Sequence, residues 1–424
     1  MRLLYDIGIR LYYGFAWLIS PWNRKAKLWV KGRRGWQARL HQVFQPADRV
    51  VWIHCASLGE FEQGRPVIEA FRERCPGHKI LLTFFSPSGF EKRKDYEGAD
   101  HVMYLPLDTA RNARIMLDFL SPEMVLFIKY EFWYHFLRRL KKAGVPVYLA
   151  SGIFRPGQVF FKWYGTWYRR FLDCFTHIFV QQEASRQLLE KYGLARVTVA
   201  GDTRFDRVKQ VTDTDYSHRA LEEFVSGAKV IVAGSTWEAD EQLLEAVARE
   251  LPQDLRWIIA PHELSAAHLQ KLEKRFPNSV RFTELERETG PASLTKLTHP
   301  DIRVVIVDTI GQLSFLYRYG TMAYIGGGFG KGIHNILEAA TYGLPVIFGP
   351  NHQRFSEALE LAEFGGAFPV LNKSELLSTI RQQLENPNLL KTTSEIASNY
   401  VLARVGATSV ILDEMCKKSN MIMH

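Results

Sequence analysis

The sequence of 424 residues lacks the features of most specialised classes of protein. It has only four cysteines (Cys55, Cys75, Cys174 and Cys416), which lie far apart and form no CxxC pair. A disulfide framework and a zinc ribbon are therefore excluded. A reducing, cytoplasmic location fits this cysteine usage best.

Motifs for metal and nucleic acid are also absent. The histidines His54, His262, His334 and His352 show no HExxH or similar spacing. For His54 and His352, ordinary polar contacts are the simplest interpretation. No recognised nucleic-acid-binding motif occurs either, so we expect no nucleic-acid partner.

A long uninterrupted apolar run is missing as well. Residues 3–20 are apolar and aromatic, but Asp6 and Arg10 interrupt them, whereas a spanning helix needs about 20 apolar residues. The basic residues follow this run, which argues against a signal peptide. We expect residues 1–36 to form a membrane anchor or an interfacial helix with a basic flank. A helix packed on the protein's own core is the alternative.

The charge that is present is basic. The net charge of +9 and the pI of about 9.2 favour anionic partners such as phosphorylated substrates or acidic lipid headgroups. Residues 21–36 contain six basic and no acidic side chains: Arg24, Lys25, Lys27, Lys31, Arg33 and Arg34. This block predicts contact with an anionic membrane surface, with the remaining chain on the cytoplasmic side.

Length and pattern predict two domains, because 424 residues exceed one ordinary core and suit two domains of roughly 150–200 residues. Short apolar runs alternate with helical stretches, as in a parallel sheet covered on both faces. The runs expected to be strands are 50–56, 79–85, 124–128, 145–150, 177–181 and 197–201, then 229–234, 255–261, 302–308, 321–327 and 344–350.

We therefore predict an α/β fold with two Rossmann-like, doubly wound domains. They would face each other across a cleft, where ligands bind at the carboxyl edges of both sheets. The predicted domains are 37–205 and 227–424, joined by a polar linker at 206–226. The second domain would include helices in the tail, although this tail could also fold back on the first domain, and 286–300 would form a loop.

The segment HCASLGEFEQGRP, residues 54–66, places Glu60 after a strand and close to the start of a helix. A carboxylate at this position could take a proton from an attacking hydroxyl group. Ser57 and the backbone of Gly59 could bind an anion at the helix start. The alternative, equally supported by the spacing, is that Glu60 only caps the helix.

A second segment, GGGFGKGIHNILEAATYGLPVIFGP at 326–350, follows a predicted strand. Its glycines allow close approach of the backbone to a ligand. It is no Walker A loop, because Lys331 is followed by Gly332 rather than by Ser or Thr. His334 and Glu338 are four residues apart, so we expect them one helical turn apart on the same side.

Polar segments follow other predicted strands too. In the second half they are 234–241, 261–263 and 308–313, and four loops at one sheet edge indicate a nucleotide pocket. In the first half, 129–133 and 150–154 place Lys129, Glu131 and Ser151 at the sheet edge. Surface salt bridges are the alternative there.

Taken together, several of these motifs resemble one known family. The motifs are HCASLGEFEQGRP, YLPLDT, GSTWEADE, DTIGQL and GGGFGKGIHNILEAA…GLPVIFGP. The resemblance is to the 3-deoxy-D-manno-octulosonic acid (Kdo) transferases, which are GT-B glycosyltransferases of lipopolysaccharide biosynthesis. It implies an enzyme at the bacterial inner membrane that takes CMP-Kdo as donor and a lipid A precursor as acceptor, without a metal or other cofactor.

The resemblance also implies roles for individual residues. Glu60 matches the general base, and Ser57, Gly59, Glu131 and Lys331 are candidates for sugar contacts. The positions that match CMP-binding segments are Pro261, His262, Ile310, Gly311, Gln312, Asn335, Ile336, Leu337 and Glu338.

The chain departs from the usual family motifs at three places. KYEFWYH replaces ETExWP, so that Lys129 stands where an acid is usual; PHELS replaces RHPE; and Gln312 replaces the Glu of DTxGEL. Two rival functions remain. One is a sugar-nucleotide epimerase with the same fold, and the other is a basic protein that binds nucleic acid or lipid without catalysis. Within the glycosyltransferases, another enzyme that acts at a membrane surface is a further alternative.

Overall fold

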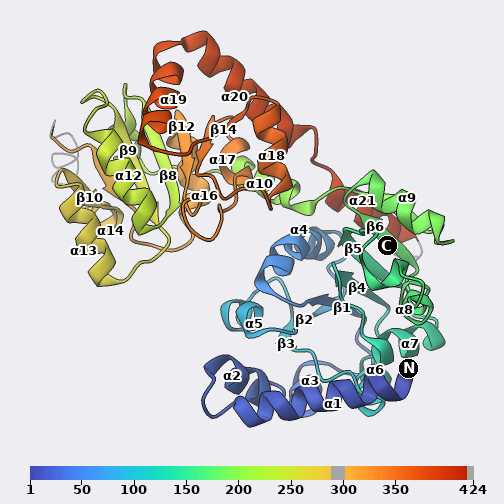
Figure 1. Ribbon diagram of the computed structural model, residues 1–424. Helices are drawn as coiled ribbons and strands as arrows, with labels where there is room; N and C mark the ends of the chain where they lie inside the picture. The colour runs from blue at the N-terminus through green and yellow to red at the C-terminus, as the bar shows by residue number, and fades with distance from the viewer. Residues whose placement is uncertain (288–300, 418–424) are drawn as a thin grey trace. The chain divides into compact units, whose positions relative to one another are not determined.

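The computed structural model describes residues 1–287 and 301–417, which form two compact units (Figure 1). Unit 1 contains residues 1–207 and the C-terminal segment from Val405, and unit 2 contains residues 208–404. Each unit is built on one parallel sheet of seven strands. The predicted α/β fold with two Rossmann-like domains is therefore confirmed.

The sheet of unit 1 has the order β3-β2-β1-β4-β5-β6-β7. The chain runs outward from β1 to β3 and then returns to the other side of β1 as β4, so the switch point lies between β1 and β4. The strands are β1 (Val50–Cys55), β2 (Lys79–Phe84), β3 (His101–Tyr104), β4 (Met124–Ile128), β5 (Val147–Gly152), β6 (His177–Val180) and β7 (Val197–Val199).

Helices cover both faces of this sheet. They are α1 (Arg2–Ile19), α2 (Arg24–Gly32), α3 (Trp36–Val43), α4 (Leu58–Arg74), α5 (Pro87–Arg93), α6 (Ala110–Leu120), α7 (Tyr134–Ala143), the 3₁₀ helix η1 (Val159–Phe161), α8 (Thr166–Leu172), α9 (Glu183–Lys191) and α21 (Ala407–Lys417). The boundary between the two units falls within α10 (Thr203–Asp213). Alternate residues of β1 serve opposite cores: Trp52 packs on the side of α3, α6 and α7, and Ile53 on the side of α4.

Unit 2 repeats this architecture with the order β10-β11-β9-β8-β12-β13-β14, and its switch point lies between β8 and β12. The strands are β8 (Val230–Thr236), β9 (Arg256–Pro261), β10 (Ser279–Arg281), β11 (Val304–Ile306), β12 (Met322–Ile325), β13 (Val346–Phe348) and β14 (Ala367–Pro369). The helices are α11 (Arg219–Val225), α12 (Glu238–Ala248), α13 (Ala266–Arg275), α14 (Phe282–Arg287), α16 (Leu313–Leu316), η2 (Tyr317–Tyr319), α17 (Leu337–Ala340), α18 (Ser356–Glu363), α19 (Lys373–Glu385) and α20 (Pro387–Leu402).

The last helix, α21, belongs to a different domain from the one predicted. The sequence placed everything from residue 227 onward in the second domain, but α21 packs on α4 of unit 1. Ile411, Leu412, Met415 and Cys416 are buried in the core beneath α4. Their i, i+1, i+4, i+5 spacing gives α21 one apolar face, and unit 1 supplies the surface that covers it. Figure 1 shows α21 in red among the elements of unit 1.

Two further segments depart from the expected picture. The predicted linker at 206–226 is helical for most of its length, since it contains the end of α10 and all of α11. The expected loop at 286–300 begins inside α14 and then lies outside the described residues. Strands β3, β10 and β14 were not predicted from the sequence.

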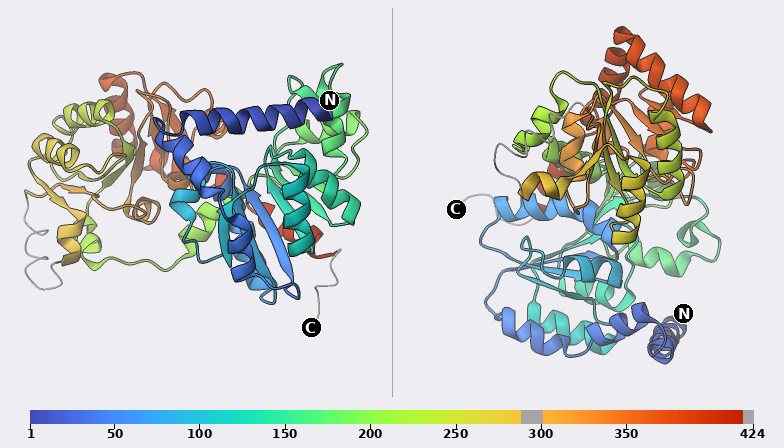
Figure 2. Two further views of the ribbon diagram at one scale, coloured as in Figure 1. Left: turned by 90° about the horizontal axis from the view of Figure 1, so that it is seen from below. Right: turned by 90° about the vertical axis from the view of Figure 1, so that its left-hand side faces the viewer.

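The first helix, α1, has two faces with different surroundings. Figure 2 shows it running along one side of unit 1. On its inner face, Tyr5 donates a hydrogen bond to the buried Asp108 at 2.5 Å, Asp6 contacts His135 at 2.5 Å, and Ala16 is buried against α2. The interpretation that this helix packs on the protein's own core is therefore correct for one face.

The outer face of α1 is exposed and apolar. Its side chains are Leu3, Leu4, Ile7, Leu11, Phe15, Trp17 and Leu18, and Trp22, just beyond the helix, is 83% exposed. Among the helices of residues 1–287 and 301–417, none combines the length and the apolarity that a membrane span requires.

One member of the predicted basic block is not on the surface. Arg33 is only 7% exposed, and it donates hydrogen bonds to the carbonyl oxygens of Trp29, Phe85 and Leu105 at 2.8–3.0 Å. Burial lowers the pKa of its guanidinium to about 9. Arg33 thus joins α2 to the loops after β2 and β3, while the other five basic residues of the block are exposed.

Candidate active site

The candidate catalytic residue lies at the switch point of unit 1. β1 ends at Cys55, Ser57 is the N-cap of α4, and Glu60 is in the first turn of this helix. Gly59 is exposed, and the space where a Cβ would project is open. The carboxyl edge at a switch point is where ligands bind in open parallel sheets, so the predicted position of Glu60 agrees with the structure.

Only one of the two carboxylate oxygens of Glu60 accepts a hydrogen bond from the described residues. Oε2 accepts a hydrogen bond from the Ala56 backbone N–H at 2.5 Å, and Ser57 Oγ accepts from the Glu60 N–H at 3.5 Å. Oε1 has no hydrogen-bond partner within the described residues. Glu60 thus contributes to the helix start, as the capping alternative held, and still offers one oxygen for chemistry.

The Glu60 carboxyl is more readily protonated in the protein than a carboxyl exposed to solvent. Burial, and next the negative charge of Glu131, raise the pKa of Glu60 to about 7, although the Ala56 N–H and Lys129 act in the opposite direction. A carboxylate with a pKa near 7 is a better proton acceptor at neutral pH than an ordinary one, and it is still ionised in about half of the molecules at that pH.

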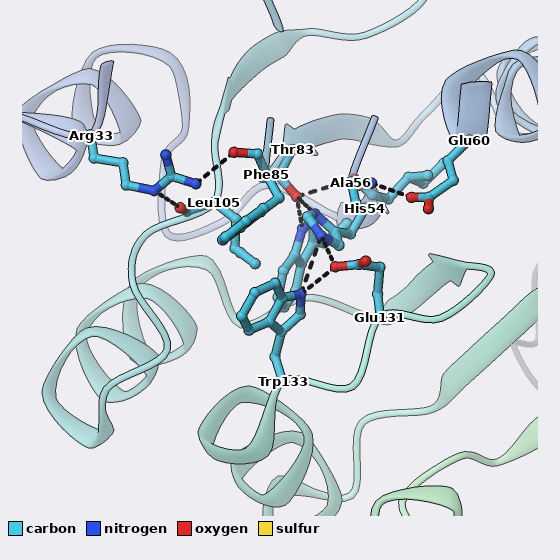
Figure 3. Close-up of polar contacts among 11 residues, drawn as sticks. Arg33, His54, Ala56, Glu60, Thr83, Phe85, Leu105, Glu131 and Trp133 are labelled. Atoms are coloured by element: carbon cyan, nitrogen blue, oxygen red, sulfur yellow. Dashed lines mark hydrogen bonds and ion pairs between the residues drawn. The ribbon is translucent and has the colours of Figure 1, made fainter. Parts of the chain in front are cut away.

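Glu131 lies on the other side of the switch point, in the loop that follows β4. This loop begins with Lys129, whose φ of +62° is unusual for a residue other than glycine. One oxygen of Glu131, Oε2, is 3.0 Å from His54 Nε2 and 2.7 Å from Trp133 Nε1 (Figure 3). The two acidic residues proposed from the sequence are therefore brought to the same edge of the sheet.

The contacts of His54 continue into the core of unit 1. His54 is fully buried on β1, and its Nδ1 lies 2.8 Å from Thr83 Oγ1 on β2. Thr83 also accepts a hydrogen bond from Trp52 Nε1 at 2.7 Å. The interpretation that His54 makes ordinary polar contacts agrees with these partners, although its contact with Glu131 was not predicted.

Aromatic side chains connect this loop to α2. Trp133 packs on Phe85 with 4.9 Å between ring centroids, and Phe85 in turn packs under the guanidinium of Arg33. Figure 3 shows this line of contacts from Arg33 to Glu131. Ser151, the third candidate at this edge, is buried within 3.4 Å of Thr203.

The switch point of unit 2 is organised by a buried carboxylate. Asp240, in the first turn of α12, accepts hydrogen bonds from the Trp237 N–H at 2.9 Å, from the Tyr324 hydroxyl at 2.8 Å and from the Gly327 N–H at 2.8 Å. Asp240 thereby joins the loop after β8 to the glycine-rich loop after β12.

The glycines of that loop are required by the packing of the backbone itself. A Cβ on Gly326 would lie 2.3 Å from the Ser235 carbonyl oxygen, and a Cβ on Gly328 would lie 2.5 Å from the Gly349 nitrogen. Gly327 adopts a φ of +92°. The loop is therefore held close to its neighbours even before a ligand is considered.

Three rings pack together beside this loop. The His262 ring stacks on the Trp237 ring, with 4.4 Å between centroids, and on the His334 ring, with 4.6 Å, at interplanar angles of 25° and 27°. Trp237 Nε1 donates to His334 Nε2 at 3.1 Å, so this nitrogen carries no proton. Burial, and next the neighbouring His262, lower the pKa of His334, which keeps the ring neutral. Such a stack offers flat surfaces for a nucleobase.

The predicted donor-binding residues occupy the same carboxyl edge of unit 2. Pro261 ends β9, and the His262 N–H donates to the Thr236 carbonyl oxygen at 2.8 Å. Ile310 is 90% exposed, Gly311 has a φ of +93°, and Gln312 accepts a hydrogen bond from Tyr216.

The residues after the glycine-rich loop are arranged differently from the prediction. Because α17 begins only at Leu337, His334 lies in the loop, and the expected single helical turn between His334 and Glu338 is wrong. Glu338 accepts a hydrogen bond from Asn335 Nδ2 at 3.0 Å. Ile336 and Leu337 are buried, so a ligand could reach only their backbone, whereas Lys331 is exposed.

Trp133, Trp237 and Asp240 are parts of these two sites that sequence reasoning missed. Each of them follows a strand directly or opens the next helix, and this placement was the available signal. No group of three or more His, Cys, Asp or Glu side chains in residues 1–287 and 301–417 is arranged to hold a metal ion.

Comparison with known proteins agrees with this architecture. Residues 33–207 match the family described as 3-deoxy-D-manno-octulosonic-acid transferase (kdotransferase). The chain is 27% identical to the 3-deoxy-D-manno-octulosonic acid transferase of Bordetella pertussis, over 98% of each chain. It is also 27% identical to that of Aquifex aeolicus, over 79% of this chain and 86% of the relative.

Solved structures show the same fold. The UDP-GlcNAc 2-epimerase of Neisseria meningitidis bound to UDP-GlcNAc superposes with a TM-score of 0.58, at 16% identity, over 87% of this chain and all of that one. A glycosyltransferase from Rickettsia africae gives 0.53 at 12% identity, over 89% of this chain and all of that one. At such identities the likeness concerns the fold alone.

Fold and relatives together define an enzyme of the GT-B glycosyltransferase class. Two Rossmann-like units, each with loops gathered at its switch point, are the framework of this class. Over almost its entire length the chain is similar to a 3-deoxy-D-manno-octulosonic acid transferase, and its residues 33–207 match the model of that family.

Proposed function

We propose that this protein transfers Kdo from CMP-Kdo to a lipid A precursor, with inversion at the anomeric carbon and with Glu60 as general base. The observation that carries the proposal is the Glu60 carboxylate, which lies at the switch point with a pKa of about 7 and one oxygen without a hydrogen-bond partner in the described chain. The names of the relatives supply the donor sugar.

The proposed reaction is a single displacement. A hydroxyl group of the acceptor gives its proton to Glu60 while its oxygen attacks the anomeric carbon of Kdo. The bond from this carbon to the phosphate oxygen of CMP breaks, and CMP leaves with the electron pair of that bond. Attack from the face opposite to CMP inverts the configuration, and no other cofactor takes part in this scheme.

Unit 2 would hold the nucleotide. The ring stack of Trp237, His262 and His334 offers a surface for the base, and the loops at Ile310–Gln312 and Asn335–Glu338 lie at the same sheet edge. Ser57, Gly59, Glu131 and Lys331 stay candidates for contacts with the sugars.

The test incubates the purified protein with CMP-Kdo and a tetraacylated disaccharide lipid A precursor, and measures CMP release and the mass of the lipid. We expect a mass gain of one or more Kdo units. Glu60→Gln should abolish this gain, while Glu62→Gln, two residues along the same helix and paired with Arg93 on the surface, should retain it. Transfer by Glu60→Gln at the normal rate would refute the role of Glu60.

Epimerisation of a sugar nucleotide is the second candidate, because epimerases share this fold. The exposed apolar face of α1 argues against it, since an enzyme with a water-soluble substrate has no use for such a surface. Conversion of UDP-GlcNAc to its 2-epimer, without transfer to the lipid, would favour this alternative.

We also infer that the protein works at the cytoplasmic face of the bacterial inner membrane. The apolar outer face of α1 lies next to five exposed basic residues of α2 and its flank. At the start of α1, a cavity of about 600 Å³ is lined by Arg2, Arg138 and Arg170. Apolar and basic side chains side by side are typical of helices that bind anionic lipid surfaces.

Vesicle flotation tests this location. Replacing Leu4, Ile7 and Leu11 by Gln should release the protein from vesicles that contain anionic phospholipid. The matched control replaces three exposed apolar residues of unit 2 by Gln, namely Leu359, Leu371 and Leu402. This control variant should float with the vesicles to the same extent as the unmodified protein. Equal flotation of both triple variants would refute the role of α1.

A further inference from the structure

His54 occupies a position from which it can control Glu131. The ring belongs to β1, is fully buried, and lies between Thr83 on β2 and Glu131 in the loop after β4. Trp52, two residues earlier on the same face of β1, is the far end of the chain of hydrogen bonds. Figure 3 shows His54 in contact with Glu131 and Trp133.

The direction of these hydrogen bonds follows from the groups themselves. The indole of Trp52 can only donate, so Thr83 Oγ1 accepts from it. The Thr83 hydroxyl can then donate to His54 Nδ1 at 2.8 Å or to the Ile53 carbonyl at 3.5 Å, and the shorter contact is favoured. With Nδ1 accepting, the ring hydrogen is on Nε2 and points at Glu131.

The opposite arrangement is unfavourable. A bare Nε2 would face the Glu131 carboxylate at 3.0 Å, so that two acceptors would meet in a buried place. The indole hydrogen of Trp133 does not remedy this, because its nitrogen is 2.7 Å from Glu131 Oε2 and 3.3 Å from His54 Nε2. Glu131 Oε2 therefore receives two N–H donors, one from His54 and one from Trp133.

Few titratable groups face Glu60 in the described part of the chain. From the loop after β4 they are Glu131, Lys129 and Tyr130, and from β1 the thiol of Cys55. Burial raises the pKa of Glu60 most, and the negative charge of Glu131 raises it next, so the orientation of Glu131 affects how readily Glu60 takes up a proton.

We propose that His54 is a positioning residue, which holds Glu131 as an oriented anion beside Glu60 and thereby tunes proton uptake by Glu60. This inference rests on the proposed function, in which Glu60 is the general base. His54 touches neither substrate in this scheme, and it acts only through Glu131.

Two substitutions by amide side chains distinguish the contribution of Nε2 of His54 from that of Nδ1. In His54→Gln the side-chain amide reaches the place of Nε2 and can still donate to Glu131. In His54→Asn the shorter amide reaches only the place of Nδ1, so the contact with Thr83 is kept and the donor to Glu131 is lost. Both residues are neutral and polar, and comparison of the two variants therefore isolates the contact with Glu131.

The measurement is the pH profile of kcat/KM for transfer from CMP-Kdo to the lipid A precursor. For His54→Asn we expect the acidic limb to move to lower pH by about one unit, because the like charge beside Glu60 is weakened. We expect kcat to fall by about tenfold, a part of what a general base contributes. His54→Gln should keep the acidic limb of the unmodified protein.

An unshifted acidic limb in His54→Asn would overturn the inference, and so would equal shifts in both variants. Glu131→Gln covers the case in which His54→Asn does not fold: it should lower the acidic limb by itself, and an unchanged limb would also refute the inference. Failure of the proposed role of Glu60 would be recognised by a different result, namely an active Glu60→Gln variant.

Discussion

The two switch points of this molecule have the same topology and opposite chemistry. In unit 1, strand β1 and the loops after β1 and β4 bring together two carboxylates, a histidine and an indole, most of them shielded from water. In unit 2, the loops after β8, β9 and β12 bring together glycines and three packed rings. One site is suited to moving a proton, and the other to holding a flat, phosphorylated ligand.

The comparison indicates that the topology of the sheet sets the position of each site, whereas the residues of the loops set its chemistry. In both sheets the order of strands changes side next to the first strand, and the loop after that strand lies at the carboxyl edge. In unit 1 a carboxylate is buried at the cost of a raised pKa. In unit 2 the buried carboxylate, Asp240, accepts hydrogen bonds from three donors and joins the loops.

The largest expected effect comes from Glu60→Gln, which should impair catalysis in unit 1 without changing nucleotide binding in unit 2. Glu60→Gln should lower kcat by about 10²- to 10⁴-fold, because a general base contributes that much. Binding of CMP, measured by calorimetry, should stay within twofold of the unmodified protein. A parallel loss of CMP affinity would mean that the two sites are not specialised in this way.

Next in size is a change that deforms the site of unit 2. Gly328→Ala would place a methyl group 2.5 Å from the Gly349 nitrogen, and the backbone has no room to accept it. We expect CMP affinity to fall by at least tenfold and unit 2 to lose about 2–3 kcal/mol of stability. Gly77→Ala, where the added Cβ meets open space, is the control.

A smaller effect is expected from the ring stack. Trp237→Ala removes one face of the stack and the donor to His334, and should weaken CMP binding by about five- to thirtyfold. Since Trp237 belongs to unit 2, the acidic limb of the pH profile should not move. A shifted limb would show that proton transfer depends on this stack.

The smallest effect is on stability and concerns unit 1 alone. The pKa of Glu60 is raised above its ordinary value, so its stabilising contribution is complete below the ordinary pKa of a carboxyl and is lost as the pH rises through about 7. Glu60→Gln, which is neutral at every pH, should therefore gain about 2 kcal/mol over the unmodified protein at pH 8.5 and almost nothing at pH 4. Thermal unfolding at both pH values measures this difference. Equal shifts at pH 4 and pH 8.5 would contradict the raised pKa.

The sequence predicted the interior of both sheets better than their edges. Buried parallel strands such as 124–128 are uninterrupted apolar runs, and these are easy to recognise. The strands that were missed, β3, β10 and β14, are all at sheet edges, have three or four residues and contain polar or proline positions. Their pairing depends on a neighbouring strand that only the folded chain provides.

The candidate site was predictable where a residue follows a strand directly. Glu60 and Glu131 were placed at the correct edge because parallel strands end together. The contact between His54 and Glu131 was not predictable, since it joins residues 77 positions apart through a pairing of β1 with β4. The stack of Trp237, His262 and His334 likewise joins three separate loops.

The packing of α21 on unit 1 has a consequence for synthesis on the ribosome. The chain leaves unit 1 after Arg207, builds all of unit 2, and returns only at Val405. When residue 404 has been made, unit 2 is complete, but the core beneath α4 still lacks Ile411, Leu412, Met415 and Cys416. Although unit 1 is begun first, it is therefore finished after unit 2, and α4 must keep its apolar face without α21 until all of unit 2 has been synthesised.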